Sequence, residues 1–242
     1  MGRPVAGWGV PRRPADLVPG HSTADTLPPV MGTVWVIVVA AGSGSRFGGP
    51  KQYEPLAGRR VLDWSIEAAR TVADGIVVVM APEHAPRTRP GVDAVVAGGA
   101  TRSASVRAGL AAVPAEADVI VVHDGARPLA GGALFATVVA AVRDGATAVL
   151  PAVPVVDSLR HRSGGAVDRT DLVAVQTPQA FAAAALRSAH EPEPEATDDA
   201  SLVEAAGGKV VVVDGSPANV KITHPADLVV AEALVQHPEA RR

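Results

Sequence analysis

The sequence predicts an α/β fold in which a mostly parallel sheet is covered by helices on both faces. Several runs of Val, Ile and Ala are of strand length and almost continuously apolar, as strands buried on both faces are. Stretches with helical spacing of apolar residues separate these runs. A glycine-rich loop that carries Arg46 and Lys51 follows the first run. Because ligands bind where the strands of open α/β sheets end, we expect this loop to take part in ligand binding.

The apolar runs and the segments between them place the first eight elements. Strands are expected at Val34–Ala41, Gly75–Met80, Val92–Ala97, Val119–His123 and Thr147–Val153. Helices are expected at Val61–Val72, Thr101–Val113 and Leu134–Arg143. In the first helix, Leu62 and Ile66 share one face while Asp63 and Glu67 share the other, which is the spacing of an amphipathic helix.

The alternation of strand and helix stops after residue 154, where the sequence predicts a β-hairpin. Val155–Arg160 and Val167–Thr170 flank a turn of glycine and polar residues. The hairpin is too short for a core of its own, so we expect residues 155–170 to project as an arm. The elements expected beyond it are a strand at Leu172–Gln176, a helix from about Phe181, a helix at Asp198–Ala206, a strand at Val210–Val213 and a helix at Pro225–Val235.

Composition excludes several classes of protein. The 242 residues include 25 acids and 22 bases, so the chain lacks the basic field of a duplex-nucleic-acid binder. Aromatic residues make up 3%, too few for the stacking surfaces of single-strand binders. There is no cysteine, which excludes disulfides, thiolate nucleophiles and cysteine-ligated zinc. No run approaches 18 apolar residues. We therefore expect a soluble, cytoplasmic protein with no nucleic-acid or membrane partner.

The first 30 residues differ from the rest of the chain. They contain six prolines, show no apolar periodicity, and lack the apolar segment and cleavage site of a secretory signal. This composition predicts a disordered extension over residues 1–30. We expect the folded protein to start near Met31 and to form a single domain over residues 31–242.

The glycine-rich loop fits neither of two common phosphate-binding motifs. The dinucleotide fingerprint requires a third glycine where Phe47 stands. A Walker A loop requires Gly-Lys followed by Ser or Thr, whereas Pro50 precedes Lys51 and Gln52 follows it. Glycines nevertheless let backbone N–H groups approach phosphate oxygens, and the two cations of the loop add positive charge. A flexible connection without a ligand is the alternative interpretation.

The loop, with Pro50-Lys51-Gln52-Tyr53 at its end, resembles the nucleotide-triphosphate loop of the 2-C-methyl-D-erythritol 4-phosphate cytidylyltransferases. Five further segments match that family in the same order, at residues 98–106 (GGATRSASV), 122–128 (VHDGARP), 176–179 (QTPQ), 197–201 (TDDAS) and 219–223 (NVKIT). The resemblance covers about residues 33–236 and implies a Rossmann-like nucleotidyltransferase domain. It also implies transfer of a cytidylyl group from CTP to 2-C-methyl-D-erythritol 4-phosphate in isoprenoid synthesis, a Mg²⁺ cofactor, and a homodimer formed through the arm.

The resemblance implies roles for individual residues. The catalytic residues that it implies are Arg46, Lys51 and Lys221. The nucleotide-binding residues that it implies are Ala40, Ala41, Gly42, Gly98, Gly99, Ser105 and Asp124. The residues that it implies for binding the polyol phosphate are Asp124, Arg127, Arg169, Thr177 and Thr197. The sequence shows no metal-ligand spacing, so we expect Mg²⁺ to be held mainly by triphosphate oxygens and water.

Simpler structural interpretations stay open for several of these residues. Asp124 can cap the turn that follows its strand, and Thr197 can belong to a helix N-cap. Thr177 can be part of a strand-ending turn, and Arg169 can be a solvated hairpin residue. Ala100 departs from the family pattern, because an acid often stands there beside the cytosine.

Three other functions compete with the one that the resemblance implies. A ribitol-5-phosphate cytidylyltransferase would perform the same chemistry on a different polyol. A non-catalytic nucleotide-binding paralogue is disfavoured because Arg46, Lys51, Asp124 and Lys221 are all present. A nicotinamide-dependent dehydrogenase is disfavoured by the missing fingerprint. Val39 is a second departure from the family pattern, because a proline is common at this position. It is not one of the charged residues.

Overall fold

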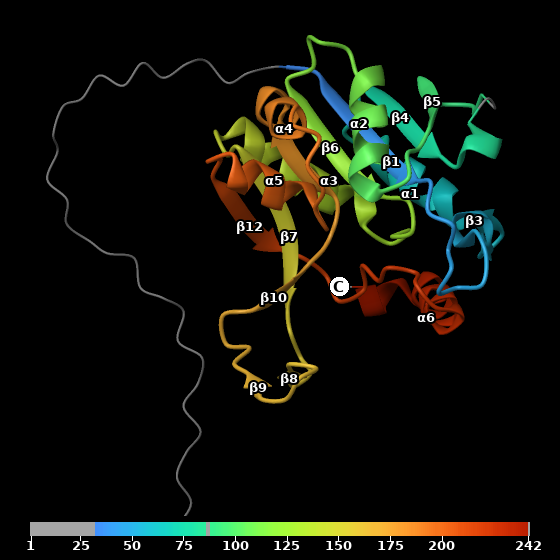
Figure 1. Cartoon of the computed structure of the whole chain (residues 1–242). Helices are drawn as coiled ribbons and strands as arrows, with labels where there is room; N and C mark the ends of the chain where they lie inside the picture. The colour runs from blue at the N-terminus through green and yellow to red at the C-terminus, as the bar shows by residue number, and fades with distance from the viewer. Residues whose placement is uncertain (1–31, 86–87, 242) are drawn as a thin grey trace, which may run out of the picture.

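An eight-stranded sheet forms the centre of the molecule, with helices against both of its faces (Figure 1). The computed structural model describes residues 32–85 and 88–241, so the predicted extension over residues 1–30 lies outside the described residues. Within these ranges no helix is long and apolar enough to cross a membrane.

The sheet is mostly parallel, as predicted. Its strands are β1 (Val34–Ala40), β4 (Gly75–Met80), β5 (Ala94–Ala97), β6 (Val119–Asp124), β7 (Ala148–Pro154), β10 (Val173–Val175), β11 (Gln179–Ala182) and β12 (Val210–Asp214). β1 lies between β4 and β6 and is parallel to both, and β5 extends the sheet beyond β4. On the other side, β11 runs antiparallel between β6 and β7, while β12 pairs with β7 in parallel.

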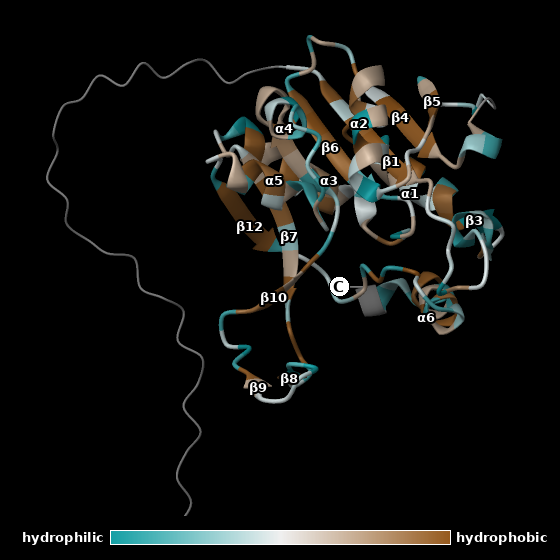
Figure 2. Ribbon diagram, viewed as in Figure 1, coloured by the Kyte–Doolittle hydropathy of each residue, from teal (hydrophilic) through white to brown (hydrophobic). Residues whose placement is uncertain are grey.

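Two apolar layers, one on each face of the sheet, form most of the core. The helices α1 (Val61–Ala69) and α3 (Gly131–Arg143) pack on one face. The other face is covered by α2 (Arg102–Ala112), α4 (Ala183–His190) and α5 (Asp199–Ala205). The central strands are buried and apolar except at the end of β6, where His123 and Asp124 stand (Figure 2), because their apolar side chains enter one layer or the other. The nearly continuous apolar runs of the sequence therefore correspond to strands of a sheet that is buried on both faces.

The region around Phe181 differs from the prediction. A helix was expected from about Phe181, but this residue lies in β11, fully buried and paired with β6 and β7. The helix α4 begins two residues later. Apolar runs this short do not separate strand from helix by their spacing, and here pairing on both sides decides for the strand.

The strand β10 also runs antiparallel to β7, so β10 and β11 follow one another along the same neighbour. Four residues lie between Val175 and Ala180, whereas two lie between their partners Ala152 and Val149. The two extra residues fall in the segment Gln176–Pro178, which therefore bulges out of the ladder. This bulge places Thr177 beside the end of β6, where its hydroxyl accepts a hydrogen bond from the backbone N–H of Asp124 at 3.0 Å.

The hairpin arm is present and extends away from the sheet (Figure 1). Its strands are shorter than predicted, with β8 at Leu159–Arg160 and β9 at Ala166–Val167 in antiparallel pairing. A second small hairpin, β2 (Pro55–Leu56) with β3 (Arg59–Arg60), was not predicted. The last long helix is α6 (Pro225–Gln236).

Candidate active site

A cleft of about 520 Å³ opens at the carboxyl ends of β1 and β6. Four segments line it: the glycine-rich loop after β1, the start of α2, the residues around Asp124, and Lys221. In the parallel ladder Val39 of β1 faces Asp124 of β6, so the glycine-rich loop and this carboxylate emerge side by side. The cleft therefore lies where open α/β sheets bind their ligands.

The glycine-rich loop folds around the carbonyl oxygen of Gly44, which accepts hydrogen bonds from Phe47 at 2.8 Å and Gly48 at 3.0 Å. Gly44 has a φ of +68°, and a Cβ there would lie 1.8 Å from the Gly49 oxygen, so only glycine fits. The buried Gln52 side chain donates to the carbonyl oxygens of Ala40 at 2.9 Å and Gly42 at 3.2 Å. The loop is therefore a fixed structure and not a flexible connection.

Three cationic side chains from this loop and from a distant segment line the cleft: Arg46, Lys51 and Lys221. Burial lowers the pKa of Lys51, and the positive charges of Lys221 and Arg46 lower it further. This mutual effect shows that the positive charges of Lys51, Lys221 and Arg46 lie close enough to repel one another. An anion with several charges would relieve this repulsion, so the cleft is suited to a polyphosphate.

Asp124, the last residue of β6, provides the carboxylate of the cleft wall. Its Oδ2 lies 2.6 Å from Nζ of Lys221, and its Oδ1 lies 3.6 Å from Nε of Arg102. Burial alone would raise the pKa of the Asp124 carboxyl, but Lys221 and Arg102 outweigh burial and hold this pKa well below its usual range. The carboxylate is therefore ionised and oriented by a cation on each oxygen.

The start of α2 forms the opposite wall of the cleft, with Gly99, Ala100 and Ser105 among its residues. Thr101 caps the helix by accepting a hydrogen bond from the Ala104 N–H at 3.0 Å. Gly98 does not line the cleft; it packs beneath the loop, where a Cβ would lie 2.3 Å from the Cβ of Ala41. This close approach joins the helix start to the glycine-rich loop.

Lys221 reaches the cleft from a segment without regular structure between β12 and α6. The next residue, Ile222, is buried and donates its N–H to the carbonyl oxygen of Ala126 at 2.8 Å. This bond ties the segment to the turn after β6. The ammonium of Lys221 is therefore held beside Asp124 by the backbone as well as by its ion pair.

Arg127 and Thr177 lie behind the cleft wall. The Arg127 guanidinium donates to the carbonyl oxygen of Asn219 at 2.7 Å. Thr177 is buried, and its hydroxyl lies 3.1 Å from Nδ1 of His123. Burial lowers the pKa of His123 to about 4, so the imidazole is neutral. Its Nε2 lies 3.3 Å from the carbonyl oxygen of Arg127, which can only accept, so Nε2 carries the proton and Nδ1 accepts from the Thr177 hydroxyl. The Thr177 hydroxyl therefore supports both residues, accepting from the Asp124 N–H with its oxygen and donating its proton to His123.

Thr197 and Arg169 lie outside the cleft lining. Thr197 is exposed, and the N-cap of α5 is its neighbour Asp198, which accepts from Ser201 N–H at 2.9 Å. Arg169 lies on the arm, where its guanidinium donates to the carbonyl oxygens of Val155 and Val156. The structure thus gathers Arg46, Lys51, Lys221 and Asp124 in the cleft and leaves these two residues apart from it.

The chain is similar in sequence and in fold to known proteins. A family model described as IspD, 2-C-methyl-D-erythritol 4-phosphate cytidylyltransferase, matches residues 34–237. The chain belongs to this family. The 2-C-methyl-D-erythritol 4-phosphate cytidylyltransferase of Cereibacter sphaeroides is 43% identical over 219 residues, which cover 84% of this chain and 97% of that protein. The crystal structure of the Thermus thermophilus cytidylyltransferase shares 39% identity and a TM-score of 0.73, covering 85% of this chain and 100% of that one.

The chain is also similar to bifunctional members of the family. The IspD/IspF enzyme of Nitratidesulfovibrio vulgaris is 42% identical over 229 residues, which cover 82% of this chain but 57% of that protein. The structure of the bifunctional IspDF from Campylobacter jejuni has a TM-score of 0.74 at 26% identity, with 82% of this chain and 54% of that chain covered. The chain therefore spans about half the length of these bifunctional relatives. The predicted nucleotidyltransferase fold is confirmed by the family's solved structures.

Arg102 and Gln52, which both line the cleft, were not among the predicted site residues. Arg102 lines the cleft and pairs with Asp124 and Asp199. Gln52 fixes the glycine-rich loop. Both lie within family motifs, so the motifs alone were a signal. Their roles depend on partners that the chain brings together only on folding, 97 residues apart for Arg102 and Asp199.

Proposed function

We propose that the protein transfers a cytidylyl group from CTP to 2-C-methyl-D-erythritol 4-phosphate, giving 4-diphosphocytidyl-2-C-methyl-D-erythritol and pyrophosphate. The observation that carries the proposal is the convergence of Arg46, Lys51 and Lys221 on one cleft beside the ionised Asp124. Membership of the cytidylyltransferase family supports it. In this proposal residues 31–242 form one catalytic domain that acts in the cytoplasm.

The proposed reaction is an in-line displacement at the α-phosphorus of CTP. A phosphate oxygen of the polyol forms the new P–O bond, and the bond to the bridging oxygen of pyrophosphate breaks. The nucleophile is already an anion, so no general base is required, and positioning with charge neutralisation lowers the barrier. Lys51, Arg46 and Lys221 are the groups placed to neutralise charge on the transferred phosphoryl group and the leaving group.

The nucleotide half of the site is proposed along the loop and the start of α2. The backbone around Ala40, Ala41 and Gly42 faces the phosphates, and Gly99 and Ser105 face the base. Gly98 contributes through the close packing that joins the two segments. Asp124 lies between this half and the polyol half, where its position allows contact with either substrate.

The polyol half is proposed to include Arg127, Thr177, Thr197 and Arg169. Arg127 and Thr177 adjoin Asp124 at the cleft wall. Thr197 and Arg169 lie outside the cleft of their own chain. We propose that the arm packs on a second copy of the chain, so that Arg169 completes the site of the neighbouring subunit. Exchange of an arm between two-fold related subunits is a low-cost route to such a dimer.

The cleft is compatible with Mg²⁺ that is bound mainly through the substrate. Among residues 32–85 and 88–241 no cluster of three metal-ligating side chains occurs. Asp124 is the carboxylate that lines the cleft, and each of its oxygens already has a cationic neighbour. Mg²⁺ commonly binds through substrate phosphates, water and one or two carboxylates, which fits this donor set. When bound, the ion would supply positive charge to the triphosphate.

The test is pyrophosphate release from CTP with a panel of polyol phosphates. We expect rapid release with 2-C-methyl-D-erythritol 4-phosphate, slower release with ribitol 5-phosphate, and none with CTP alone. Preference for ribitol 5-phosphate would identify the alternative polyol as the substrate. Binding of CTP without release for any polyol would contradict the proposed transfer and favour a nucleotide-binding protein.

A further inference from the structure

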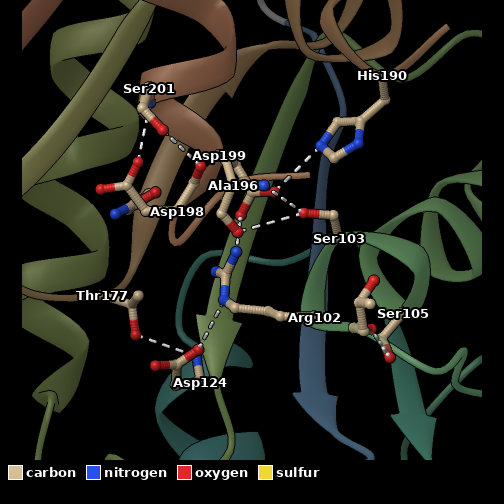
Figure 3. A network of polar contacts seen from close by, with 12 residues as sticks. Arg102, Ser103, Ser105, Asp124, Thr177, His190, Ala196, Asp198, Asp199 and Ser201 are labelled. Carbon is tan, nitrogen blue, oxygen red and sulfur yellow. Dashed lines mark hydrogen bonds and ion pairs between the residues drawn. The ribbon is translucent and has the colours of Figure 1, made fainter. Parts of the chain in front are cut away.

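Arg102 connects two carboxylates that belong to different parts of the fold. It is the first residue of α2, and its Nη1 donates to Oδ2 of Asp199 at 2.7 Å while its Nε lies 3.6 Å from Oδ1 of Asp124 (Figure 3). Burial lowers the pKa of the guanidinium, but Asp199 and Asp124 outweigh burial and raise this pKa above its ordinary value. Arg102 is therefore a fixed positive charge in the cleft wall.

Asp199 is a fully buried carboxylate whose two oxygens both have partners. Oδ2 accepts from Arg102, and Oδ1 lies 3.0 Å from Nε2 of the buried His190 at the end of α4. A buried carboxylate is strongly unfavourable unless it is paired and hydrogen-bonded. Asp199 does not line the cleft, so its direct contacts indicate one role, which is to hold Arg102 from behind.

The first turns of α2 also form hydrogen bonds with the segment that precedes Asp199. Thr101 donates to the carboxylate of Glu195 at 2.9 Å, Ser103 accepts from the N–H of Ala196 at 3.1 Å, and Arg107 donates to the Pro194 carbonyl oxygen at 2.9 Å. The segment 194–199 is thereby fixed to the helix whose start lines the cleft. Of the α2 residues that contact this segment, Arg102 also contacts Asp124, which links the segment to the charged groups of the cleft.

We infer that Arg102 is a positioning residue: held by Asp199, it restrains Oδ1 of Asp124 and leaves Oδ2 to pair with Lys221. The inference rests on the proposed function and adds residues to it, because Arg102, Asp199 and His190 set the place of the Lys221 ammonium without transferring any group. The division of Asp124 between two cations depends on the pull of Asp199 on the guanidinium.

Asp199→Asn separates this role from simple packing. The amide has the shape of the carboxylate, but its NH2 group replaces one of the two oxygens, so an acceptor no longer faces both Arg102 and His190. The negative charge behind the guanidinium is also lost. Among the residues that the structure describes, Asp124 is then the one remaining carboxylate within 4.0 Å of Arg102. Arg102 should move toward Asp124 and weaken the ion pair between Asp124 and Lys221.

The first measurement needs no turnover. The chain has three lysines, Lys51, Lys209 and Lys221, so trace labelling with acetic anhydride and mass spectrometry reports each separately. In Asp199→Asn we expect labelling of Lys221 relative to the exposed Lys209 to rise at least about threefold, the scale of coupling between contacting residues. Unchanged relative labelling of Lys221 in a folded variant would overturn the inference.

A second pair of variants keeps the inference falsifiable if Asp199→Asn does not fold. The amide of His190→Gln can still donate to Asp199, whereas His190→Leu cannot. We expect the glutamine variant to label Lys221 as the wild type does, and the leucine variant to label it faster. Equal labelling in both variants would show that His190 contributes only packing, and that the restraint does not extend through Asp199.

Kinetics then test whether the restraint affects transfer. We expect Arg102→Met and Asp199→Asn each to lower kcat by about tenfold with a smaller change in KM for CTP, and the double variant to lose no more than Arg102→Met alone. Arg107→Gln is the matched control, because it loosens the 194–196 segment without touching Asp124, and its kcat should stay near that of the wild type. Additive losses, or an equal loss in Arg107→Gln, would overturn the inference. Absence of pyrophosphate release in the wild type would instead refute the proposed function, while the labelling result would still decide the inference.

Discussion

The cleft and the hairpin arm differ in where their side chains find partners. In the cleft, Asp124 joins Lys221 to Arg102, and Gln52 fixes the loop from below. These groups come from segments far apart in the sequence. In the arm, the hydrogen bonds described for residues 155–170 join this segment only to itself or to the adjacent Leu172. The charged groups of the cleft are therefore held by contacts between distant segments of one chain, whereas the hydrogen bonds described for the arm are local.

Apolar exposure confirms the difference. Val156 in the arm is 82% exposed, and Leu172 and Val173 at its base are 40% and 49% exposed. Burying such side chains gains about 25 cal/mol per Å² of apolar surface, so an arm of this kind is stabilised by a partner surface. Under the proposed function, the charged groups around the nucleotide come from one polypeptide, whereas the polyol half is completed by a second copy of the chain.

We expect the largest loss of activity from removing the Lys51 ammonium from the cleft. Lys51→Ala should lower kcat by about a hundredfold, a loss of about 3 kcal/mol in transition-state stabilisation, with little change in KM for CTP. The physical reason is that the ammonium neutralises charge that develops only during transfer. Steady-state pyrophosphate release checks this, with Lys209→Ala as a control because that exposed lysine lies outside the cleft. A normal kcat with weaker CTP binding would show that Lys51 only holds the substrate.

The second prediction asks whether the arm completes a neighbouring site. Arg169→Ala and Lys51→Ala should each be nearly inactive. Refolding them together should restore about a quarter of wild-type activity, because half of the dimers are mixed and each mixed dimer has one intact site. No recovery in mixed dimers would show that Lys51 and Arg169 serve the same chain. A monomer in sedimentation at the assay concentration would contradict the exchange directly.

The contrast also explains how much the sequence predicts. The apolar runs at β1, β4 and β6 were placed to within a residue, because strands buried on both faces have an unambiguous composition. Since these strands are parallel, the predicted loop after β1 and Asp124 after β6 had to meet at one edge. In the structure, Asp124 lies beside the start of the glycine-rich loop at this edge. The individual catalytic and binding roles stay predictions.

What the sequence did not predict depends on contacts between distant segments. Phe181 lies in a strand because β6 and β7 flank it, and no local spacing records those neighbours. The pairing of Arg102 with Asp199 spans 97 positions and shows no periodicity. The arm was predicted as a projection because a break in alternation is local, but its strands are shorter than the apolar pattern indicated.

The third prediction concerns nucleotide selectivity, which we expect to depend on residues of the cleft and not on residues of the arm. CTP should be preferred over UTP by about tenfold or more, and purine nucleotides should not be used, because a site that hydrogen-bonds the pyrimidine edge penalises ligands that leave those bonds unmade. Ser105→Ala should lower the ratio of kcat/KM for CTP and UTP, whereas Arg169→Lys should leave this ratio unchanged. Turnover of ATP at the rate of CTP would contradict a pyrimidine site.

The smallest expected effect is a shift in the pH profile, which separates the two regions without abolishing activity. Burial and the neighbouring Lys221 and Arg46 lower the pKa of Lys51. The ammonium therefore loses its proton at a lower pH than a free lysine does, and kcat should fall as the pH rises through this lowered pKa. Arg46→Gln removes one repelling charge, so it should raise the pKa of Lys51 and move the alkaline limb of kcat to higher pH. Arg169→Lys, which changes the arm alone, should leave the limb in place. An alkaline limb that moves with Arg169 but not with Arg46 would show that the arm, and not the cleft, sets the charge state on which transfer depends.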